Sequence, residues 1–149
     1  MKDIVLISCV KSKKEGCHAA KELYEGTLYK AHLTFAKEVL GIDEEDIYII
    51  SAKHGLVALT DEICKYEKTL NNMSKSLREK WAKDTYIQMK NKFGNLNDYN
   101  FIFLAGEKYM YPLRDLLPYS SVPTELQDKL PLGKRIQKLH QCIENKRKD

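Results

Sequence analysis

Three apolar runs of this chain each end in small or polar residues that are followed by a lysine. The residues concerned are Ser8, Cys9, Lys11 and Ser12 after the first run, Ser51, Lys53, His54 and Gly55 after the second, and Gly106, Glu107 and Lys108 after the third. Hydroxyl and ammonium groups suit an anion such as a phosphate or a carboxylate. Small residues let a ligand approach the backbone closely. We therefore predict one ligand-binding site from these residues, the alternative being ordinary polar loops.

Three residues in or near these run ends are candidates for acid–base catalysis. His54 titrates near neutral pH and could act as a general acid or base, or it is simply a turn residue. Asp61 could activate a water molecule or stabilise positive charge on a sugar ring, or it starts a turn. Glu107 could act in the same way, although an acidic residue is favourable in the first turn of any helix. Tyr66 could stack on a base or donate a hydrogen bond, or it packs its loop in place.

The first run end leaves two choices open. Cys9 would be a nucleophile if a nearby cation lowered its pKa, but we favour the alternative of a small buried hydrophobe. Ser8 is better suited to a hydrogen bond with a ligand. Among the neighbouring lysines we prefer Lys11 as a phosphate contact because it lies closest to the apolar run, and we assign Lys13 and Lys14 to a solvated face.

The elements that must position these residues follow from the apolar pattern. The runs Asp3–Cys9, Asp46–Ala52 and Tyr99–Ala105 lack alternation, which is typical of strands buried on both faces. Helices are predicted over Thr27–Leu40, from a capping box of Ser76 and Glu79 to Phe93, over Glu107–Leu117 and over Gly133–Asn145, with a short fourth strand over Tyr119–Val122. This order predicts a single three-layer α/β domain over residues 1–149 with a mostly parallel sheet. Ligands bind outside the carboxyl ends of such strands, where the three run ends would meet.

Composition sets wider limits on function. The chain has 149 residues with 43% apolar and 31% charged side chains, and its net charge of +4 permits a polyanionic partner without requiring one. We find no targeting segment and no stretch long enough to span a membrane, so we expect a cytoplasmic protein with no membrane partner. No motif implies a cofactor or a metal ion. We expect His32 and His140, on predicted helices, to be surface or boundary residues.

The four cysteines lie far apart in the sequence and form no CxxC pair. In a cytoplasmic chain we expect Cys9, Cys17, Cys64 and Cys142 to be free thiols. A zinc site made of Cys9, Cys17 and His18 does not match the spacing of structural zinc sites.

Four segments carry a resemblance to a known family. They are "LISCVKSKK" (6–14), "SAKHGLV" (51–57), the spaced "D-x-I-x-x-Y-x-x-T-L" (61–70) and "LAGEKY" (104–109). Over about Ile4 to Ile136 the chain resembles a family of short bacterial and phage proteins, most of which lack an assigned function. More distantly it is similar to the YaaA-type peroxide stress proteins and to the uracil-DNA-glycosylase-like core of archaeosine synthase. The chain is much shorter than the YaaA type, so the extra DNA-binding elements of that family are not carried over.

The resemblance implies a uracil-DNA-glycosylase-like domain near nucleobase or nucleic-acid chemistry. Together with the run ends, it leads to two hypotheses. The first is a protein that recognises a nucleotide, nucleoside or nucleobase, as an enzyme acting near the glycosidic bond. The second is a binding protein without catalysis, which sequesters a nucleotide or binds nucleic acid.

Overall fold

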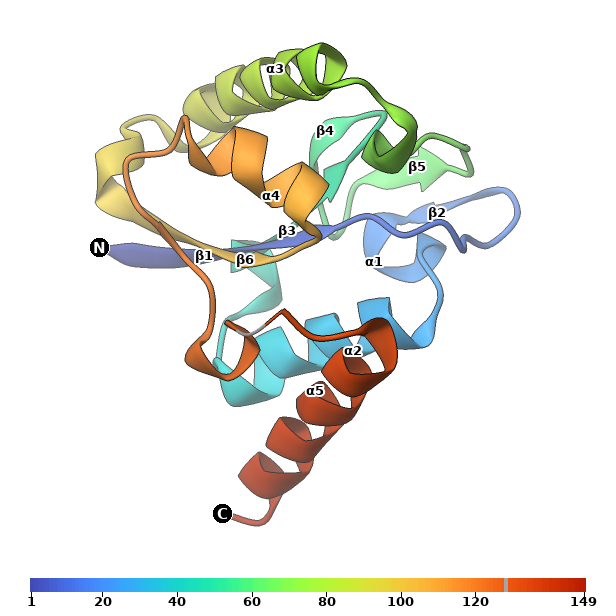
Figure 1. Ribbon diagram of the computed structural model, residues 1–149, viewed down its shortest axis with the longest axis vertical. Coiled ribbons are helices and arrows are strands. Elements are labelled where there is room, and N and C mark those ends of the chain that lie inside the picture. The colour runs from blue at the N-terminus through green and yellow to red at the C-terminus, as the bar shows by residue number, and fades with distance from the viewer. Residues whose placement is uncertain (128) are drawn as a thin grey trace.

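A five-stranded sheet with helices on both of its faces forms the frame of the molecule (Figure 1). The structure is a computed structural model and describes residues 1–127 and 129–149. The strands of this sheet are β1 (Lys2–Ser8), β3 (Ile47–Ser51), β4 (Gly55–Ala58), β6 (Tyr99–Leu104) and β7 (Ser120–Ser121). A separate two-stranded ribbon consists of β2 (Cys17–Ala19) and β5 (Glu62–Cys64). The α-helices are α1 (Ala20–Leu23), α2 (Thr27–Thr34), α3 (Lys75–Phe93), α4 (Glu107–Arg114) and α5 (Leu132–Arg147).

The main sheet is mixed, with the strand order β4-β3-β1-β6-β7. β1 pairs in parallel with β3 and β6, and β7 pairs in parallel with β6. β4 pairs antiparallel to β3 because the chain turns back directly after Ser51. The prediction of a mostly parallel sheet is therefore corrected, and the "KHG" segment after β3 is the turn of a hairpin instead of a crossover loop.

Each face of the sheet is covered by one pair of helices. α3 packs with α4 over one face, and α2 packs with α5 over the other (Figure 1). The central strand β1 is buried from Ile4 to Ile7, as the non-alternating apolar run predicts. No helix within the described ranges is long and apolar enough to cross a membrane.

Most long elements lie where the sequence predicts them. The three buried strands are confirmed within about one residue at each end, and the helix predicted over 27–40 is α2 followed by a π-helical turn (Phe35–Val39). The predicted capping box is wrong: α3 begins after Ser74, whose hydroxyl oxygen accepts a hydrogen bond from the Leu77 N–H at 3.3 Å. The predicted fourth strand is reduced to the two residues of β7.

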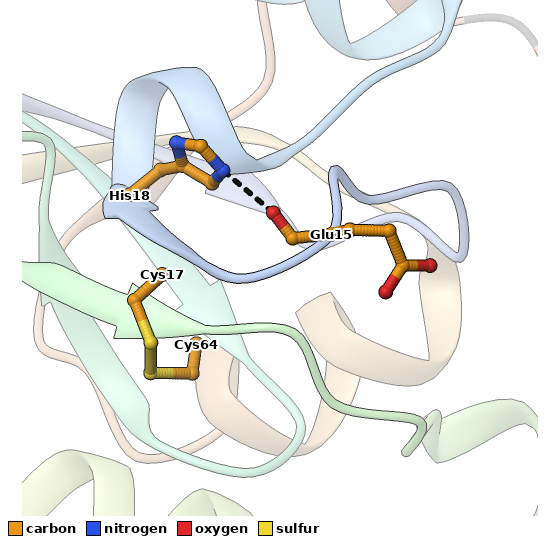
Figure 2. The surroundings of a disulfide bond; sticks show 4 residues. All are labelled: Glu15, Cys17, His18 and Cys64. Atoms are coloured by element: carbon orange, nitrogen blue, oxygen red, sulfur yellow. Dashed lines mark hydrogen bonds between the residues drawn. A yellow bond between two sulfur atoms is a disulfide. The ribbon is translucent and has the colours of Figure 1, made fainter.

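Two of the four cysteines form a disulfide. Cys17 of β2 and Cys64 of β5 face each other in the antiparallel ribbon, and their sulfurs are bonded (Figure 2). The prediction that all four cysteines are free is wrong for this pair and holds for Cys9, which is buried, and Cys142. Because Cys17 is disulfide-bonded, it offers no thiolate to a zinc site with Cys9 and His18.

Candidate ligand-binding site at the carboxyl edge of the sheet

The ends of β1, β3 and β6 meet at one edge of the sheet, which we call the carboxyl edge. The parallel register pairs Ser8 with Ile50 and Ile7 with Leu104, so the strands end nearly level. The Ser8 hydroxyl oxygen accepts a hydrogen bond from the Gly106 N–H at 3.3 Å, which joins the ends of β1 and β6. The structure thus brings the residues after all three apolar runs to the same edge.

A chain of hydroxyl groups lies under this edge. The Tyr66 hydroxyl is 2.7 Å from the Ser51 Oγ and 2.7 Å from the Tyr24 hydroxyl, and all three residues are buried. We call Ser51, Tyr24 and Tyr66 the tyrosine cluster. Burial raises the pKa of Tyr24 to about 12 and also raises the pKa of Tyr66, so both phenols stay protonated at neutral pH. They order the site and do not act as bases.

Ser51 holds the turn that follows β3. Its Oγ accepts hydrogen bonds from the backbone N–H groups of Lys53 at 3.2 Å and His54 at 3.0 Å. Its carbonyl accepts a hydrogen bond from the indole N–H of Trp81 at 2.9 Å. Ser51 therefore connects the tyrosine cluster with both the turn and α3.

Lys13 is buried, contrary to the sequence prediction. Its residue is 8% exposed, and its ammonium nitrogen lies 4.4 Å from the centre of the Tyr66 ring and 5.7 Å from that of Tyr24. Its hydrogen bond within the described chain goes to the Lys11 carbonyl at 3.3 Å. Burial lowers the pKa of the Lys13 ammonium, and cation–π contact with the aromatic faces offsets part of that desolvation. The assignment of Lys13 to a solvated face is wrong. Lys11, the preferred lysine, is exposed.

Cys9 is a buried thiol with polar neighbours. Its Sγ lies 3.3 Å from the Tyr109 hydroxyl and accepts a hydrogen bond from the Ala52 N–H at 3.4 Å. The Tyr109 hydroxyl in turn accepts a hydrogen bond from the Leu70 N–H at 3.3 Å. Cys9 thus fits the structural interpretation of a small buried side chain that ties the end of β1 to neighbouring segments.

A groove of about 450 Å3 lies between the β3–β4 turn and α3, and we call it the lysine groove. Its lining residues are Ala52, Lys53, His54, Gly55, Lys68, Met73, Leu77, Lys80, Trp81, Asp84, Thr85 and Gln88. Lys53, Lys68 and Lys80 bring positive charge, and Asp84, which pairs with Lys80 at 3.0 Å, is the single carboxylate of the lining. Of the predicted site residues, Lys53, His54 and Gly55 line this groove.

His54 lies between the lysine groove and the tyrosine cluster. Its ring meets the edge of the Tyr66 ring at a centroid distance of 5.4 Å. Burial and the nearby Lys53 charge lower the pKa of His54, so the imidazole is neutral at neutral pH. A neutral imidazole can both donate and accept a hydrogen bond, so the group suits a polar ligand or a proton transfer.

Gly55 has a positive φ in the turn between β3 and β4. Its φ is +69°, and an added Cβ would collide with the side-chain amide of Gln88. That amide is occupied: its oxygen accepts the Leu56 N–H at 2.9 Å, and its nitrogen donates to the His54 carbonyl at 3.0 Å. Gly55 therefore lets α3 approach the hairpin closely.

Asp61 and Glu107, the two predicted catalytic carboxylates, lie outside the lysine groove. The Asp61 Oδ2 accepts the Ala58 N–H at 2.9 Å, which fits the alternative of a turn residue. β4 carries the chain away from the carboxyl edge before Asp61 is reached. Glu107 begins α4, is exposed, and pairs with Lys129 at 3.6 Å.

The remaining predicted ligand contacts are dispersed around the edge. Ser12 is exposed, and Gly106 caps the start of α4. Lys108 donates a hydrogen bond from Nζ to the Asn71 carbonyl at 3.3 Å. Lys108 and Glu107 line a second groove of about 460 Å3 between α3 and α4, which also contains Tyr111.

Most residues that line the lysine groove are not predicted from the sequence, among them Lys68, Lys80 and Trp81, and neither is Tyr24 of the tyrosine cluster. Lys68 and Lys80 fall outside the three run ends and carry no motif. The sequence identifies Trp81 as an apolar position of a helix. Its indole N–H, which needs a partner when buried, is the single sign of a polar contact. Tyr24 follows a short helix and had no periodic signal.

Acidic residues gather at the opposite end of the molecule. The carboxylates of Asp43, Glu45 and Asp46 lie within 4.8 Å of one another, before β3 begins. Asp46 forms an ion pair with Lys2 at 3.2 Å. This cluster therefore does not contribute to the chemistry at the carboxyl edge.

Most of the chain matches the model of one protein family. Residues 4–141 match the model of a family described as a family of unknown function, DUF6884. The chain belongs to the DUF6884 family. No curated protein matches the sequence. The matched residues run from Ile4 of β1 into α5, so they include the tyrosine cluster and the lysine groove. The match links the chain neither to the peroxide stress proteins nor to archaeosine synthase.

Proposed function

We propose that this protein binds a nucleotide in the lysine groove. The observation that carries the proposal is the charge of the groove lining, which contains three lysines and one carboxylate and lies at the carboxyl edge of the sheet. Open α/β sheets bind their ligands at this edge. Lys53 and Lys68 have no carboxylate within ion-pair distance in the described ranges, so their charges are available to a phosphate.

The groove also has room and surface for a nucleoside. Its volume of about 450 Å3 lies within the roughly 300–1,000 Å3 that is common for small-molecule sites. Met73, Leu77 and Trp81 form an apolar side against which a base can pack. His54, as a neutral imidazole, can hydrogen-bond a sugar or base edge. A ligand that places a phosphate at the lysines and a base against the apolar side is a mononucleotide.

A second candidate is catalysis at the glycosidic bond, with His54 as the general acid or base. It is favoured by the position of the neutral imidazole on the groove wall. The distant resemblance to the YaaA type and to a uracil-DNA-glycosylase-like fold supports the same chemistry by analogy. Non-catalytic sequestration of the nucleotide, or binding of nucleic acid, is the alternative.

Isothermal titration of the protein with AMP, GMP, CMP, UMP, adenosine and inorganic phosphate tests the binding proposal. We expect at least one nucleoside monophosphate to bind, and AMP to bind at least about tenfold more tightly than adenosine if adenine is the preferred base. The double variant Lys53→Ala/Lys68→Ala should weaken binding by at least about tenfold.

The matched control is Lys83→Ala/Lys92→Ala, which removes the same charge from exposed positions of α3 that do not line the lysine groove. This variant should change the affinity by less than about twofold. Equal losses in the two double variants would place the effect in the general field of the protein and reject the groove.

The catalytic candidate has its own test. Incubation with the bound nucleotide, followed by chromatography, would detect release of the free base. We expect His54→Gln to reduce turnover by at least about a hundredfold while changing binding only a few-fold. Binding without base release would leave the non-catalytic role, and release that survives in His54→Gln would remove His54 from the chemistry.

A further inference from the structure

The disulfide joins the chain segment that carries Tyr66 of the tyrosine cluster to the segment that carries Lys13, whose ammonium lies over the Tyr66 ring. Lys13 lies four residues before Cys17, and Tyr66 lies two residues after Cys64. The ammonium of Lys13 sits 4.4 Å from the Tyr66 ring, so the two segments meet again at the cluster. The covalent bond between Cys17 and Cys64, shown in Figure 2, thus links the two segments close to both side chains in the sequence.

The ribbon that carries the disulfide is small. β2 and β5 share three residue pairs, and a further hydrogen bond runs from the Lys65 N–H to the Gly16 carbonyl at 3.0 Å. Two-stranded ribbons of this size are only marginally stable alone. Polar contacts add little, because the ion pair of Lys65 with Glu15 is exposed. The disulfide is therefore the covalent constraint at the Cys17–Cys64 end of the ribbon, while a hydrogen bond from the Ala20 N–H to the Asp61 carbonyl at 2.7 Å holds the other end.

Other contacts hold the Lys13 segment to the body of the protein. The Lys14 N–H donates to the Leu23 carbonyl at 2.8 Å, and the Glu25 N–H donates to the Ser12 carbonyl at 2.9 Å. Opening the disulfide would remove the covalent link between the Lys13 and Tyr66 segments and so loosen their contact, while these hydrogen bonds, the sheet and its helices stay in place.

Tyr66 links the ribbon to the lysine groove. Its hydroxyl is hydrogen-bonded to the Ser51 Oγ, and the same Oγ accepts hydrogen bonds from the backbone N–H groups of Lys53 and His54. Its ring also packs against the His54 ring. A displacement of Tyr66 therefore changes the positions of two groove residues.

Both cysteines of the pair are exposed, whereas the free Cys9 is buried. An external thiol can reach the disulfide, and disulfides that are exposed belong to the labile and regulatory kind more often than buried ones do. We propose that the Cys17–Cys64 disulfide is a redox switch that holds the lysine groove in its binding form when oxidised. This inference rests on the proposed nucleotide binding.

The switching reaction is an exchange with a dithiol reductant. One thiolate of the dithiol attacks a sulfur of the pair and forms a mixed disulfide, and its second thiol then displaces the protein sulfur. The protein gains two electrons and two protons as Cys17 and Cys64 become thiols, and the dithiol becomes a disulfide. Reoxidation by a disulfide compound reverses each step.

The test uses the full chain in three forms: wild type, Cys17→Ser/Cys64→Ser, and the control Cys142→Ser, which removes a thiol of α5 far from the ribbon in sequence. Each is measured with and without dithiothreitol. The first reading is the rate at which Lys13 reacts with an N-hydroxysuccinimide acetate, followed by peptide mass spectrometry with Lys92 as an internal reference. The second reading is the affinity for the best-binding nucleoside monophosphate.

We expect reduction to raise the Lys13 labelling rate and to weaken nucleotide binding, each by at least about fivefold, in wild type and in Cys142→Ser. Cys17→Ser/Cys64→Ser should behave like the reduced protein and ignore the reductant. An unchanged Lys13 rate, or an affinity that does not follow it, would overturn the switch. If Lys13 responds but no nucleotide binds in either state, the proposed function fails while the redox opening of the ribbon stands.

Discussion

At the scale of single residues, Ser51 has a structural role that its sequence context does not predict. The predicted ligand contact is a buried hydroxyl that accepts two backbone N–H groups and bonds the Tyr66 hydroxyl at 2.7 Å. A small residue at the end of a strand thereby organises the turn that carries Lys53 and His54. The same side chain cannot also be fully available to a ligand, so its contribution to binding is one of positioning.

Ser51→Ala should lower the free energy of unfolding by about 2–3 kcal/mol, because the substitution removes the acceptor of two N–H groups and leaves the buried Tyr66 hydroxyl with Tyr24 as its remaining partner. Urea unfolding followed by Trp81 fluorescence measures this loss. The control Ser12→Ala removes an exposed hydroxyl and should change stability by less than about 0.5 kcal/mol. Equal stabilities of the two variants would show that the hydroxyl network contributes nothing.

The lysines after β1 show the limit of prediction at this scale. The sequence favours Lys11 as the ligand contact because it lies closest to the strand, whereas the structure buries Lys13. The reason is an isolated bridge between Lys13 and Tyr24, which turns this part of the loop inward. Contacts between segments that are distant in sequence decide such cases, and no local pattern records them.

At the scale of elements, the sequence predicts what is long and apolar. β1, β3 and β6 are continuous runs of Ile, Val, Leu and aromatic residues, and the prediction that their ends form one edge is confirmed by the register. β2, β4 and β5 have three or four residues each, too few for a period to be visible. The disulfide could not be predicted either, since it depends on the pairing of two of these short strands.

The packing of α2 on α5 contains a buried histidine that is paired with a half-buried arginine. His32 was expected at the surface, but it is 3% exposed and its Nε2 accepts a hydrogen bond from the Arg135 Nε at 3.1 Å. Burial and the guanidinium charge lower the pKa of His32 to about 3. The imidazole is therefore neutral in the folded protein over most of the pH range.

This pair predicts a loss of stability in acid. Because the folded pKa lies below the unfolded value of 6.5, the folded state resists proton uptake, so its stability is complete above about pH 6.5 and falls as the pH drops toward about 3. His32→Gln keeps an acceptor for Arg135 but cannot be protonated. Urea unfolding of both proteins between about pH 7 and 4 should show a steeper decline for the wild type. Parallel declines would mean that His32 takes no part in acid unfolding.

At the scale of the whole molecule, charge is unevenly distributed. α3 carries six basic and two acidic side chains, a net charge equal to the +4 of the entire chain. The rest of the molecule is neutral in sum, with acidic residues gathered before β3. α5, with five basic and one acidic side chain, has the same net charge, so the positive charge gathers on two helices, one on each face of the sheet. α3 forms one wall of the lysine groove, and its charge favours the approach of an anionic ligand to that site.

The covalent bond between Cys17 and Cys64 also acts on the whole molecule. It joins residues separated by 47 positions, and the enclosed segment contains α1, α2, β3 and β4. In the chain-entropy account, a cross-link of this span restricts the unfolded state and stabilises the fold by about 2–4 kcal/mol. Cys17→Ser/Cys64→Ser, or reduction of the wild type, should lower the free energy of urea unfolding by that amount, with the far-ultraviolet circular dichroism of the native state unchanged.

Cys142→Ser is the control for this measurement and should unfold like the wild type under oxidising conditions, because Cys142 takes no part in the disulfide. The comparison separates two consequences of one bond. A global loss of stability acts through the unfolded chain and requires no change at the lysine groove, whereas the labelling of Lys13 reports opening of the native ribbon. The reduced protein could keep the wild-type unfolding midpoint and still be labelled faster at Lys13. That result would show that the disulfide stabilises only the ribbon, and that other contacts already restrict the unfolded state.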